Sequence, residues 1–465
     1  MNARERTGTH GNARRDANGA VAAGPRGPGY GGEWPRMTLK EAGVTLIDCD
    51  HRTPPAAAAG YPYVAIPQVR GGRLDLKDVR RITPEHYEDW TRKARPAADD
   101  VVLSRRCNPG ETAWVPPGLE FALGQNLVLL RADGAEVHPP FLRWLARSAH
   151  WWEQVEKFMN VGAVFDSLRC ADVPRFELPV PPLPSQRAID EILGALDDKI
   201  DLNRRMSETL EVMARALFKS WFVDFDPVQA KAEGSDPGLS RQVGDLFPIS
   251  FEHSDVGRIP KGWTLGSILT QATLMSGGTP KTDREDYWNG DVRWASAKDV
   301  SQCSDSFLLE TERTITRAGL SESATQLIPA FATVVVARGA TTGRMVLFGR
   351  EMAMNQTCYA LVSTGGTPFA LHCLLQNAMG SLVHASHGSV FDTITTSTFK
   401  ASRVLLAPLK TLAAFETVVS PLFLKIREHS LESRSLAALR DTLLPKLISG
   451  ELRIPDAERI VGEVA

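Results

Sequence analysis

Residues 185–222 read SQRAIDEILGALDDKIDLNRRMSETLEVMARALFKSWF, and apolar side chains recur in them at alternating steps of four and three. This spacing is typical of a helix that packs against another helix along one narrow seam. The stretch contains Gly194 but no other glycine and no proline, so little in it would interrupt a helix. We therefore predict a central helix over residues 185–223 that pairs with a second helix. Its seam positions are Ile189, Leu193, Leu196, Ile200, Asn203, Ser207, Leu210, Ala214, Leu217 and Trp221.

Residues 409–449, near the C-terminus, repeat this spacing. The seam positions there are Phe415, Val419, Leu422, Ile426, His429, Ser433, Leu436, Arg440, Leu443 and Leu447. An antiparallel pair would bring the polar midpoints of the two seams together, with Asn203 beside Ser433 and Ser207 beside His429. A parallel pair would also match polar with polar, and two separate amphipathic helices, each packed on its own domain, are a further alternative. We favour the antiparallel pair because it gives the two halves of the chain a pseudo-two-fold axis.

The two helices belong to a longer internal repeat. Residues 164–166 (VFD) recur 226 positions later as residues 390–392, and the same offset superimposes the two seams. Earlier in each half the offset is 233, which brings residues 81–83 (RIT) onto residues 314–316 (TIT). The matches keep the same order in both halves. The sequence therefore predicts a tandem duplication.

The segments outside the helices divide into β-rich domains and connecting chain. Short β-branched and aromatic runs broken by Gly and Pro fill residues 34–184 and 261–408, a pattern typical of β-rich domains. Residues 1–33 hold almost no large apolar side chain and are predicted to form a disordered leader. Residues 224–260 are a linker, and residues 450–465 are a tail. The predicted fold class is α+β, with two tandem β-rich domains separated by long helices that pair as an antiparallel coiled coil with pseudo-two-fold symmetry.

The composition excludes several classes of protein. The 465 residues include 53 Lys and Arg against 55 Asp and Glu, so the chain is not a strongly basic, free-standing nucleic-acid binder. No run approaches 18 consecutive apolar residues, which excludes a membrane-spanning helix. The six cysteines are far apart and form no CxxC pair. We therefore predict reduced thiols in a cytoplasmic protein, with no disulfide framework and no metal site.

The motifs of common catalytic sites are absent. The sequence contains no GxxxxGK(S/T) phosphate loop, no GxGxxG after a strand and no GxSxG elbow. The pair Asp197-Asp198 sits among seam residues of the central helix and is interpreted as a solvated helix face. We predict no catalytic residue in this chain, and an enzyme of unrecognised type is the least favoured alternative.

Several segments resemble the specificity subunit of type I restriction-modification systems. The resemblance covers essentially the whole chain after Trp34, although residues 33–54 and the start of the second helix match more loosely. It is carried by residues 216–227 (ALFKSWFVDFDP), 246–248 (LFP), 259–263 (IPKGW), 277–280 (GGTP), 294–296 (WAS), 299–300 (DV) and 439–452 (LRDTLLPKLISGEL). Together these segments identify the chain as a member of that family.

The resemblance implies a division of labour. Each β-rich domain would be a target recognition domain that reads one half of a bipartite sequence in double-stranded DNA. The paired helices would act as a spacer and dock two modification (methyltransferase) subunits, which restriction (translocase-nuclease) subunits would join. S-adenosylmethionine, ATP and Mg²⁺ are then expected on the partner subunits only, and no cofactor is expected on this chain. Two alternatives stay open, a modification-only assembly and an interaction scaffold that no longer reads DNA.

The charge of each segment bears on how DNA would be held. Residues 34–183 carry 19 basic and 19 acidic residues, and residues 258–408 carry 13 and 11. Neither domain is strongly cationic, so we predict weak DNA binding by the isolated subunit. Arginine is the commonest reader of guanine edges. The loop candidates for DNA contact are Arg105, Arg106, Lys281, Arg338 and Arg344.

Two further interpretations remain open at this level. Arg105 and Arg338 occupy matching positions of the repeat, which suits base reading in two equivalent loops but also suits phosphate contact or a structural role. Tyr287 and Trp288 could contact DNA, although tryptophan in a β-rich domain is more often a core residue.

Overall fold

The computed structural model describes residues 34–162, 165–385 and 393–463. The predicted leader, residues 1–33, lies outside the described residues. So do Val164 and the whole of the second VFD motif, residues 390–392.

The chain forms two compact units. Residues 1–194 together with 441–465 make the first unit, and residues 195–440 make the second. Each unit has its own β-sheets and its own buried apolar core.

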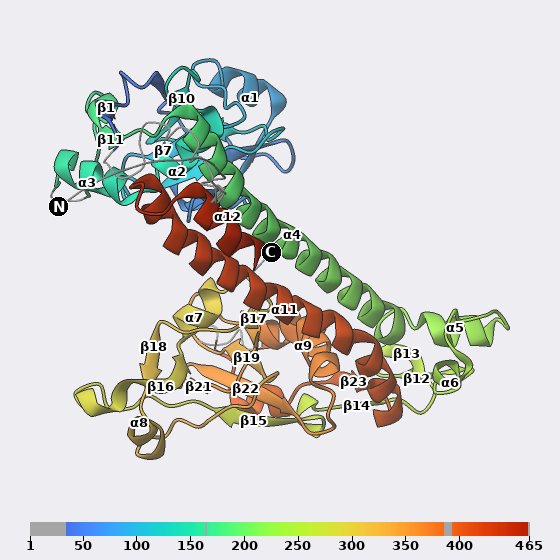
Figure 1. Cartoon of the computed structure of the whole chain (residues 1–465). Coiled ribbons are helices and arrows are strands. Elements are labelled where there is room, and N and C mark those ends of the chain that lie inside the picture. Colours follow the sequence, from blue (N-terminus) through green and yellow to red (C-terminus); the bar gives the residue numbers. More distant parts are fainter. Residues whose placement is uncertain (1–33, 163–164, 386–392, 464–465) are drawn as a thin grey trace, which may run out of the picture. The chain divides into compact units, whose positions relative to one another are not determined.

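Two long helices run through the chain, α4 (Leu183–Phe222) and α11 (Leu409–Ile448), each of 40 residues. Figure 1 draws α4 in green and α11 in red. α4 begins two residues earlier than predicted because Pro184 is tolerated in the first turn of a helix, where the backbone N–H needs no intrahelical partner. Each helix begins in one unit and ends in the other. With two tandem domains of mixed strands and helices, these helices confirm the predicted fold class.

Within the second unit the two helices are antiparallel. The Asn203 amide donates to the Ser433 hydroxyl (3.4 Å), and the Ser207 hydroxyl lies 3.3 Å from Nδ1 of His429. From one contact to the next, the residue number rises along α4 and falls along α11. A buried ion pair between Asp197 and Arg440 continues the same register. These contacts are the pairs that the antiparallel arrangement predicts. The interpretation of Asp197 as a solvated residue was wrong, because its carboxylate balances an arginine inside the seam.

Every seam position is buried or half-buried. The fully buried ones include apolar residues of both helices, such as Leu196 and Leu443, as well as the polar Asn203 and His429. The half-buried seam residues are Ile200, Ser207, Leu210, Leu217, Leu422 and Ser433. A buried polar layer inside an apolar seam costs stability but specifies the register of the helices.

The first unit is built on a four-stranded antiparallel sheet with the order β2-β10-β7-β8. Its central strands are continuous apolar runs buried on both faces, which explains why they do not alternate with polar residues. The strands of this unit are β1 (Arg36–Thr38), β2 (Val44–Asp48), β3 (Tyr61–Val64), β4 (Val69–Arg70), β5 (Arg73–Leu74), β6 (Arg81–Ile82), β7 (Val101–Ser104), β8 (Thr112–Trp114), β9 (Ala122–Leu123), β10 (Leu127–Ala132) and β11 (Glu177–Pro179). Its short helices are α1 (Pro84–Trp90), α2 (Leu142–Leu145) and α3 (Ala149–Phe158).

The second unit is built on a five-stranded sheet with the order β15-β22-β19-β20-β17. The strands of this unit are β12 (Phe251–Ser254), β13 (Gly257–Pro260), β14 (Thr264–Gly266), β15 (Ala272–Ser276), β16 (Trp288–Ala295), β17 (Phe307–Leu308), β18 (Arg313–Ile315), β19 (Thr333–Val336), β20 (Met345–Phe348), β21 (Ala353–Met354), β22 (Cys358–Ser363) and β23 (Val404–Leu406). Its short helices are α5 (Asp226–Ala232), α6 (Arg241–Gly244), α7 (Ala297–Gln302), α8 (Arg317–Ser321), α9 (Pro368–Ala385) and α10 (Thr396–Lys400).

The two domains share one topology. The order β2-β10-β7-β8 corresponds to β15-β22-β19-β20, and β6-β3-β9 corresponds to β18-β16-β21. The aligned threonines Thr83 and Thr316 both cap the helix that follows, each accepting a hydrogen bond from the backbone three residues on. The repeat found in the sequence is therefore a repeat of the fold.

Each long helix carries an acidic residue that ties it to the domain beside its N-terminus. In the first unit, Oδ1 of Asp190 on α4 accepts hydrogen bonds from Arg143 and Trp144, both at 2.8 Å. In the second unit, 226 residues later, Glu416 on α11 accepts from the backbone N–H groups of Phe369 (3.3 Å) and Ala370 (2.8 Å) at the start of α9. The same position therefore anchors both helices, through different contacts.

The connecting segments also contain structure. Residues 224–260 form α5, α6 and the β12–β13 hairpin. The segment 450–465 contains α12 (Ile454–Gly462). Both α5 and α12 start shortly after a long helix and have a proline in the first turn, Pro227 and Pro455. Among the described residues, no helix is both long enough and apolar enough to cross a bilayer.

Candidate nucleic-acid interface

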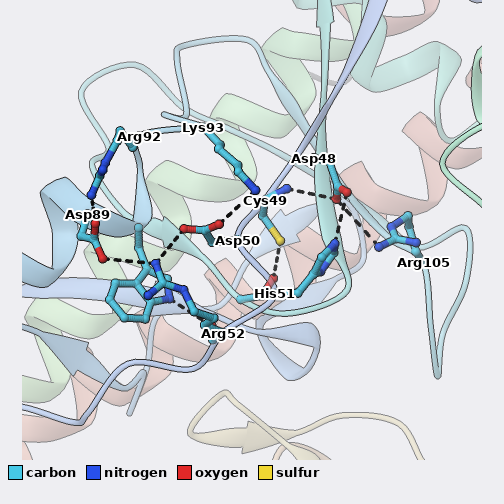
Figure 2. A network of polar contacts seen from close by, with 11 residues as sticks. Asp48, Cys49, Asp50, His51, Arg52, Asp89, Arg92, Lys93 and Arg105 are labelled. Atoms are coloured by element: carbon cyan, nitrogen blue, oxygen red, sulfur yellow. Dashed lines mark hydrogen bonds and ion pairs between the residues drawn. The ribbon is translucent and has the colours of Figure 1, made fainter.

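The β7–β8 hairpin of the first unit carries Arg105. β7 is an entirely buried strand, and Arg105 leaves it at the first residue of the loop. The arginine side chain is only 12% exposed, and its Nη2 lies 3.8 Å from Oδ1 of Asp48 at the end of β2. Its Nη1 donates to the carbonyl oxygen of Leu168 at 3.4 Å. Figure 2 shows the contact with Asp48. Arg105 therefore connects the loop to two other segments of its own domain.

Arg106 follows in the same loop and is exposed. Its guanidinium lies 5.3 Å from the centre of the Phe165 ring, which is itself 44% exposed. The loop turns sharply after it, with positive φ at Cys107 and Gly110. Arg106 thus presents a cation beside an exposed aromatic ring, a combination suited to phosphate contact and base stacking.

Three other cations of the first domain pair with acidic neighbours (Figure 2). Arg52 pairs with Asp50 (3.0 Å) and with Asp89 (3.2 Å). Lys93 lies 3.2 Å from the second oxygen of Asp50, and Arg92 also contacts Asp89. Hydrogen bonds from Arg52 and Lys93 hold the pKa of Asp50 below its usual value. Three basic residues of the first domain are therefore paired with two of its aspartates.

The β19–β20 hairpin of the second unit carries Arg338 and Arg344. Both side chains are exposed, and neither forms an ion pair or a side-chain hydrogen bond within residues 34–162, 165–385 and 393–463. The backbone between them is well fixed: Val336 N–H donates to the Arg344 carbonyl at 2.8 Å, and Gly343 N–H donates to the Val336 carbonyl at 2.9 Å. The hairpin therefore carries two guanidinium groups that have no acidic partner among the described residues, on a turn closed by backbone hydrogen bonds.

Lys281 lies in a different segment, before β16. It is exposed, and its carbonyl oxygen accepts a hydrogen bond from Nε1 of Trp288 at 3.1 Å. Trp288 and Tyr287 are 7% and 4% exposed, so both are core residues and not DNA contacts. The Arg313 guanidinium stacks 3.5 Å from the centre of the Trp288 ring. Lys281 is therefore an exposed cation whose backbone is hydrogen-bonded to a buried tryptophan, and its side chain has no partner among the described residues.

The structure thus groups the five predicted residues into three places. Arg105 and Arg106 share the β7–β8 hairpin, Arg338 and Arg344 share the β19–β20 hairpin, and Lys281 stands apart. Their roles in DNA contact stay predictions.

Sequence reasoning missed the cluster of Asp48, Cys49 and His51, whose side chains lie close together. The run Asp-Cys-Asp-His at residues 48–51 is the signal that could have found it. Burial, together with the Asp48 carboxylate, raises the pKa of the Cys49 thiol to about 11.

Known proteins match this chain in both halves. A family model described as the type I restriction modification DNA specificity domain matches residues 51–212 and again residues 260–411. The type I restriction enzyme HindI specificity subunit of Haemophilus influenzae is 25% identical over 409 residues, which cover 78% of this chain and 88% of the relative. The MjaIX specificity subunit of Methanocaldococcus jannaschii is 25% identical over 421 residues, covering 86% of each chain.

A solved structure shares the fold. The S subunit of a type I restriction-modification system from M. genitalium aligns with a TM-score of 0.51 and 15% identity, covering 90% of this chain and 97% of that one. The two family matches fall on the two copies of the repeated domain, and together they span most of the sequence. The chain therefore belongs to the family of type I restriction-modification DNA specificity subunits.

Proposed function

We propose that this chain reads a bipartite sequence in double-stranded DNA, each recognition domain reading one half. The observation that carries the proposal is the duplicated domain. Two copies of one fold each match the DNA specificity model, and each presents arginines on the same hairpin of its main sheet. Two readers of one topology with different loops suit a target made of two different half-sites.

The two hairpins supply the proposed contacts. Arg338 and Arg344 are exposed and unpaired among the described residues, which leaves their guanidinium groups available for the O6 and N7 atoms of guanine. Arg106 and Lys281 are exposed as well and are proposed to contact phosphate or bases. Arg105 is proposed to support its loop, because its side chain is almost buried and bound to its own domain.

The affinity of the isolated chain is proposed to be weak. The 19 basic residues of the first domain are matched by 19 acidic ones, and several of them pair within the domain, so the net charge available to release counterions from DNA is small. Much of the phosphate contact would then come from partner subunits. Tight binding of a duplex by the purified chain at physiological salt would contradict this part of the proposal.

The helices are proposed to dock the partner subunits. On the part of α4 that lies in the second unit, Leu202, Met206, Val212 and Met213 are exposed by 41–57% although they are apolar. They lie outside the seam that packs on α11. An exposed apolar surface of this kind marks an interaction site. We propose that two modification subunits bind to the helices and that restriction subunits join them in the cytoplasm.

The chemistry is proposed to reside in those partners. S-adenosylmethionine would bind the modification subunits, and ATP and Mg²⁺ the restriction subunits, while this chain contributes recognition without catalysis. The absence of common catalytic motifs from the sequence is consistent with this assignment.

The helices are also proposed to set the gap between the half-sites. Adding one heptad to both α4 and α11 lengthens the coil by about 10 Å, or roughly three base pairs at 3.4 Å each. The half-sites should stay the same while the gap grows. A folded variant that keeps the original gap would contradict the spacer role.

Methylation mapping tests the proposal directly. DNA from cells that express this chain with its modification partner should carry a split, adenine-containing methylated motif, and the motif should vanish when this chain is deleted. A stable complex that methylates no motif would instead favour a scaffold that does not read DNA.

A further inference from the structure

Three side chains with metal-binding atoms meet where β2 ends in the first unit. The ligand atoms of Asp48, Cys49 and His51 all lie within 4.8 Å of one another. They come from four consecutive positions of the chain, the last residue of β2 and the irregular segment that follows it. Figure 2 shows the three side chains as neighbours, with Asp48 joined to His51.

The two carboxylate oxygens of Asp48 have different neighbours. Oδ1 accepts a hydrogen bond from the backbone N–H of Cys49 at 3.1 Å and faces the Arg105 guanidinium at 3.8 Å. Oδ2 lies 3.1 Å from Nε2 of His51. The first oxygen therefore orients the carboxylate, as outer-shell partners do at metal sites, while the second is directed toward the imidazole.

The distance between Oδ2 and the imidazole suits two ligands of one ion. Two ligands placed about 2.0–2.1 Å from a tetrahedral zinc ion lie roughly 3.3 Å apart. Cys49 is 2% exposed, and its Sγ donates to the carbonyl oxygen of Gly124 at 3.3 Å. His51 is on the open side, with half of its side chain exposed. The sulfur of the cluster is thus buried, whereas the imidazole is accessible to solvent. An ion could reach the cluster from the side of His51.

We propose that Asp48, Cys49 and His51 bind one Zn²⁺ ion, with water in the fourth position. One thiolate, one carboxylate and one neutral imidazole form a mixed S, O, N set, which zinc accepts at tetrahedral sites and which hard cations such as Mg²⁺ and Ca²⁺ do not favour. The two anionic ligands neutralise the charge of the ion. Arg105, the nearest cation, binds the outer oxygen of Asp48 and not the ligand oxygen.

The charged and titratable neighbours are compatible with this ion. Apart from Arg105, the Cys170 thiol lies close to the Asp48 carboxylate. Burial, and after it the Asp48 carboxylate, raise the pKa of the Cys170 thiol.

The second domain has no equivalent site. The strand that corresponds to β2 is β15, which ends at Ser276 and is followed by Gly277. A Cβ added to Gly277 would lie 2.1 Å from the carbonyl oxygen of Asn355, so no cysteine fits there. The ion would therefore belong to the first domain alone, where it would join the end of β2 to the turn after it. Through Asp48 it would also hold Arg105 and the β7–β8 hairpin in place.

Titration of the purified full-length chain with Zn²⁺ tests the site. The protein is first stripped with a chelator and kept reduced, and binding is followed by calorimetry. We expect one equivalent of tightly bound Zn²⁺. Cobalt(II) in place of zinc should give a sulfur-to-metal charge-transfer band, since a thiolate is one of the ligands.

The variants Cys49→Ser and His51→Ala should each weaken zinc binding at least about 100-fold, beyond the roughly 10- to 100-fold that outer-shell partners contribute. Cys107→Ser is the matched control, an exposed cysteine of the same unit outside the cluster, and it should bind as the parent does. His51 is half exposed, so its truncation leaves the fold intact even if the buried Cys49→Ser does not.

Three results would overturn the proposal. They are the absence of a tight zinc equivalent in the parent chain, unchanged affinity in His51→Ala, and a cobalt spectrum without the sulfur band. None of these readouts depends on DNA recognition.

Discussion

The β7–β8 hairpin of the first unit and the β19–β20 hairpin of the second carry an arginine at the same position of the repeat, Arg105 and Arg338. Arg105 is almost buried and bound to Asp48 and Leu168, whereas Arg338 is exposed and has no side-chain partner among the described residues. The two hairpins share one backbone topology, but the side chains around the two arginines differ. β2 ends in an aspartate that holds the arginine, and β15 ends in Ser276, which carries no charge.

Residues at equivalent positions of a repeat can therefore have different roles, because their neighbours differ. A charge that faces a carboxylate in its own domain has little left to offer a ligand, and a charge without such a partner is available for one. Equivalent positions should therefore respond differently to the same substitution, and three pairs of positions can test this.

The largest difference is expected at the acidic anchors Asp190 and Glu416. Asp190→Ala would leave the guanidinium of Arg143, whose side chain is 10% exposed, without its carboxylate. We expect a loss of about 3–5 kcal/mol of stability in the first unit. Glu416→Ala removes the hydrogen bonds to the start of α9 and one from the Ser420 hydroxyl, but leaves no buried charge without its partner. It should cost about 0.5–2 kcal/mol in the second unit, as the loss of a helix cap does.

Hydrogen exchange measured by mass spectrometry separates the two effects, with α2 reporting on the first unit and α9 on the second. Asp190→Asn is the matched control, because it keeps an acceptor for the Trp144 indole while removing the charge. If Asp190→Ala and Glu416→Ala reduced stability equally, the difference between the contacts of the two anchors would have no effect on stability.

The second difference concerns the hairpin arginines and DNA recognition. If Arg338 reads a base, Arg338→Ala should relax one position of one half-site, with a loss of about 1–3 kcal/mol of discrimination. If it contacts phosphate, the variant should weaken all targets alike. Arg105→Ala should instead destabilise the first unit and leave the recognised motif unchanged. Methylation mapping with each variant and the melting of the purified chains provide the two measurements.

Arg338→Lys is a useful companion, since it keeps the charge but loses the paired donors that read guanine. It should restore a phosphate contact but not a base contact. An Arg105→Ala variant that melts at the same temperature as the parent but changes the recognised motif would show that Arg105 contacts DNA and is not a structural residue.

The sequence predicts much of this fold because its strongest signals are periodic. The 4-3-4-3 spacing favours a helix pair. In the favoured antiparallel arrangement the polar midpoints predict the partners Asn203 with Ser433 and Ser207 with His429, which the structure confirms. The repeat is visible because core positions such as Ile82 and Ile315 must keep their size and polarity.

The candidate sites were harder to predict because they depend on which side chains meet across the sheet. Nothing near Arg105 in sequence shows that Asp48, 57 positions away, will be its partner. The cluster at residues 48–51 was missed for a related reason. Cysteine spacing alone excludes a four-cysteine framework, but it does not reveal a mixed ligand set formed by a single turn.

The smallest expected difference lies in the polar layer of the seam, where the repeat brings His429 onto Asn203, 226 positions earlier. Burial lowers the pKa of His429 from its usual 6.5, so the unfolded chain binds a proton that the folded chain resists. Stability should therefore be intact above the ordinary histidine pKa and fall as the pH drops below it.

His429→Asn makes the two helices alike at this position and should remove the pH dependence that His429 contributes. Chemical denaturation at several pH values measures the effect. Because Asn203→His adds a second titrating group to the same layer, it should steepen the loss on acidification. If the parent chain were as stable at pH 5 as at pH 8, the polar layer would tolerate a charged imidazole and the prediction would be wrong. We expect otherwise, because the hydrogen bond between Ser207 and His429 does not offset the cost of burying a charge.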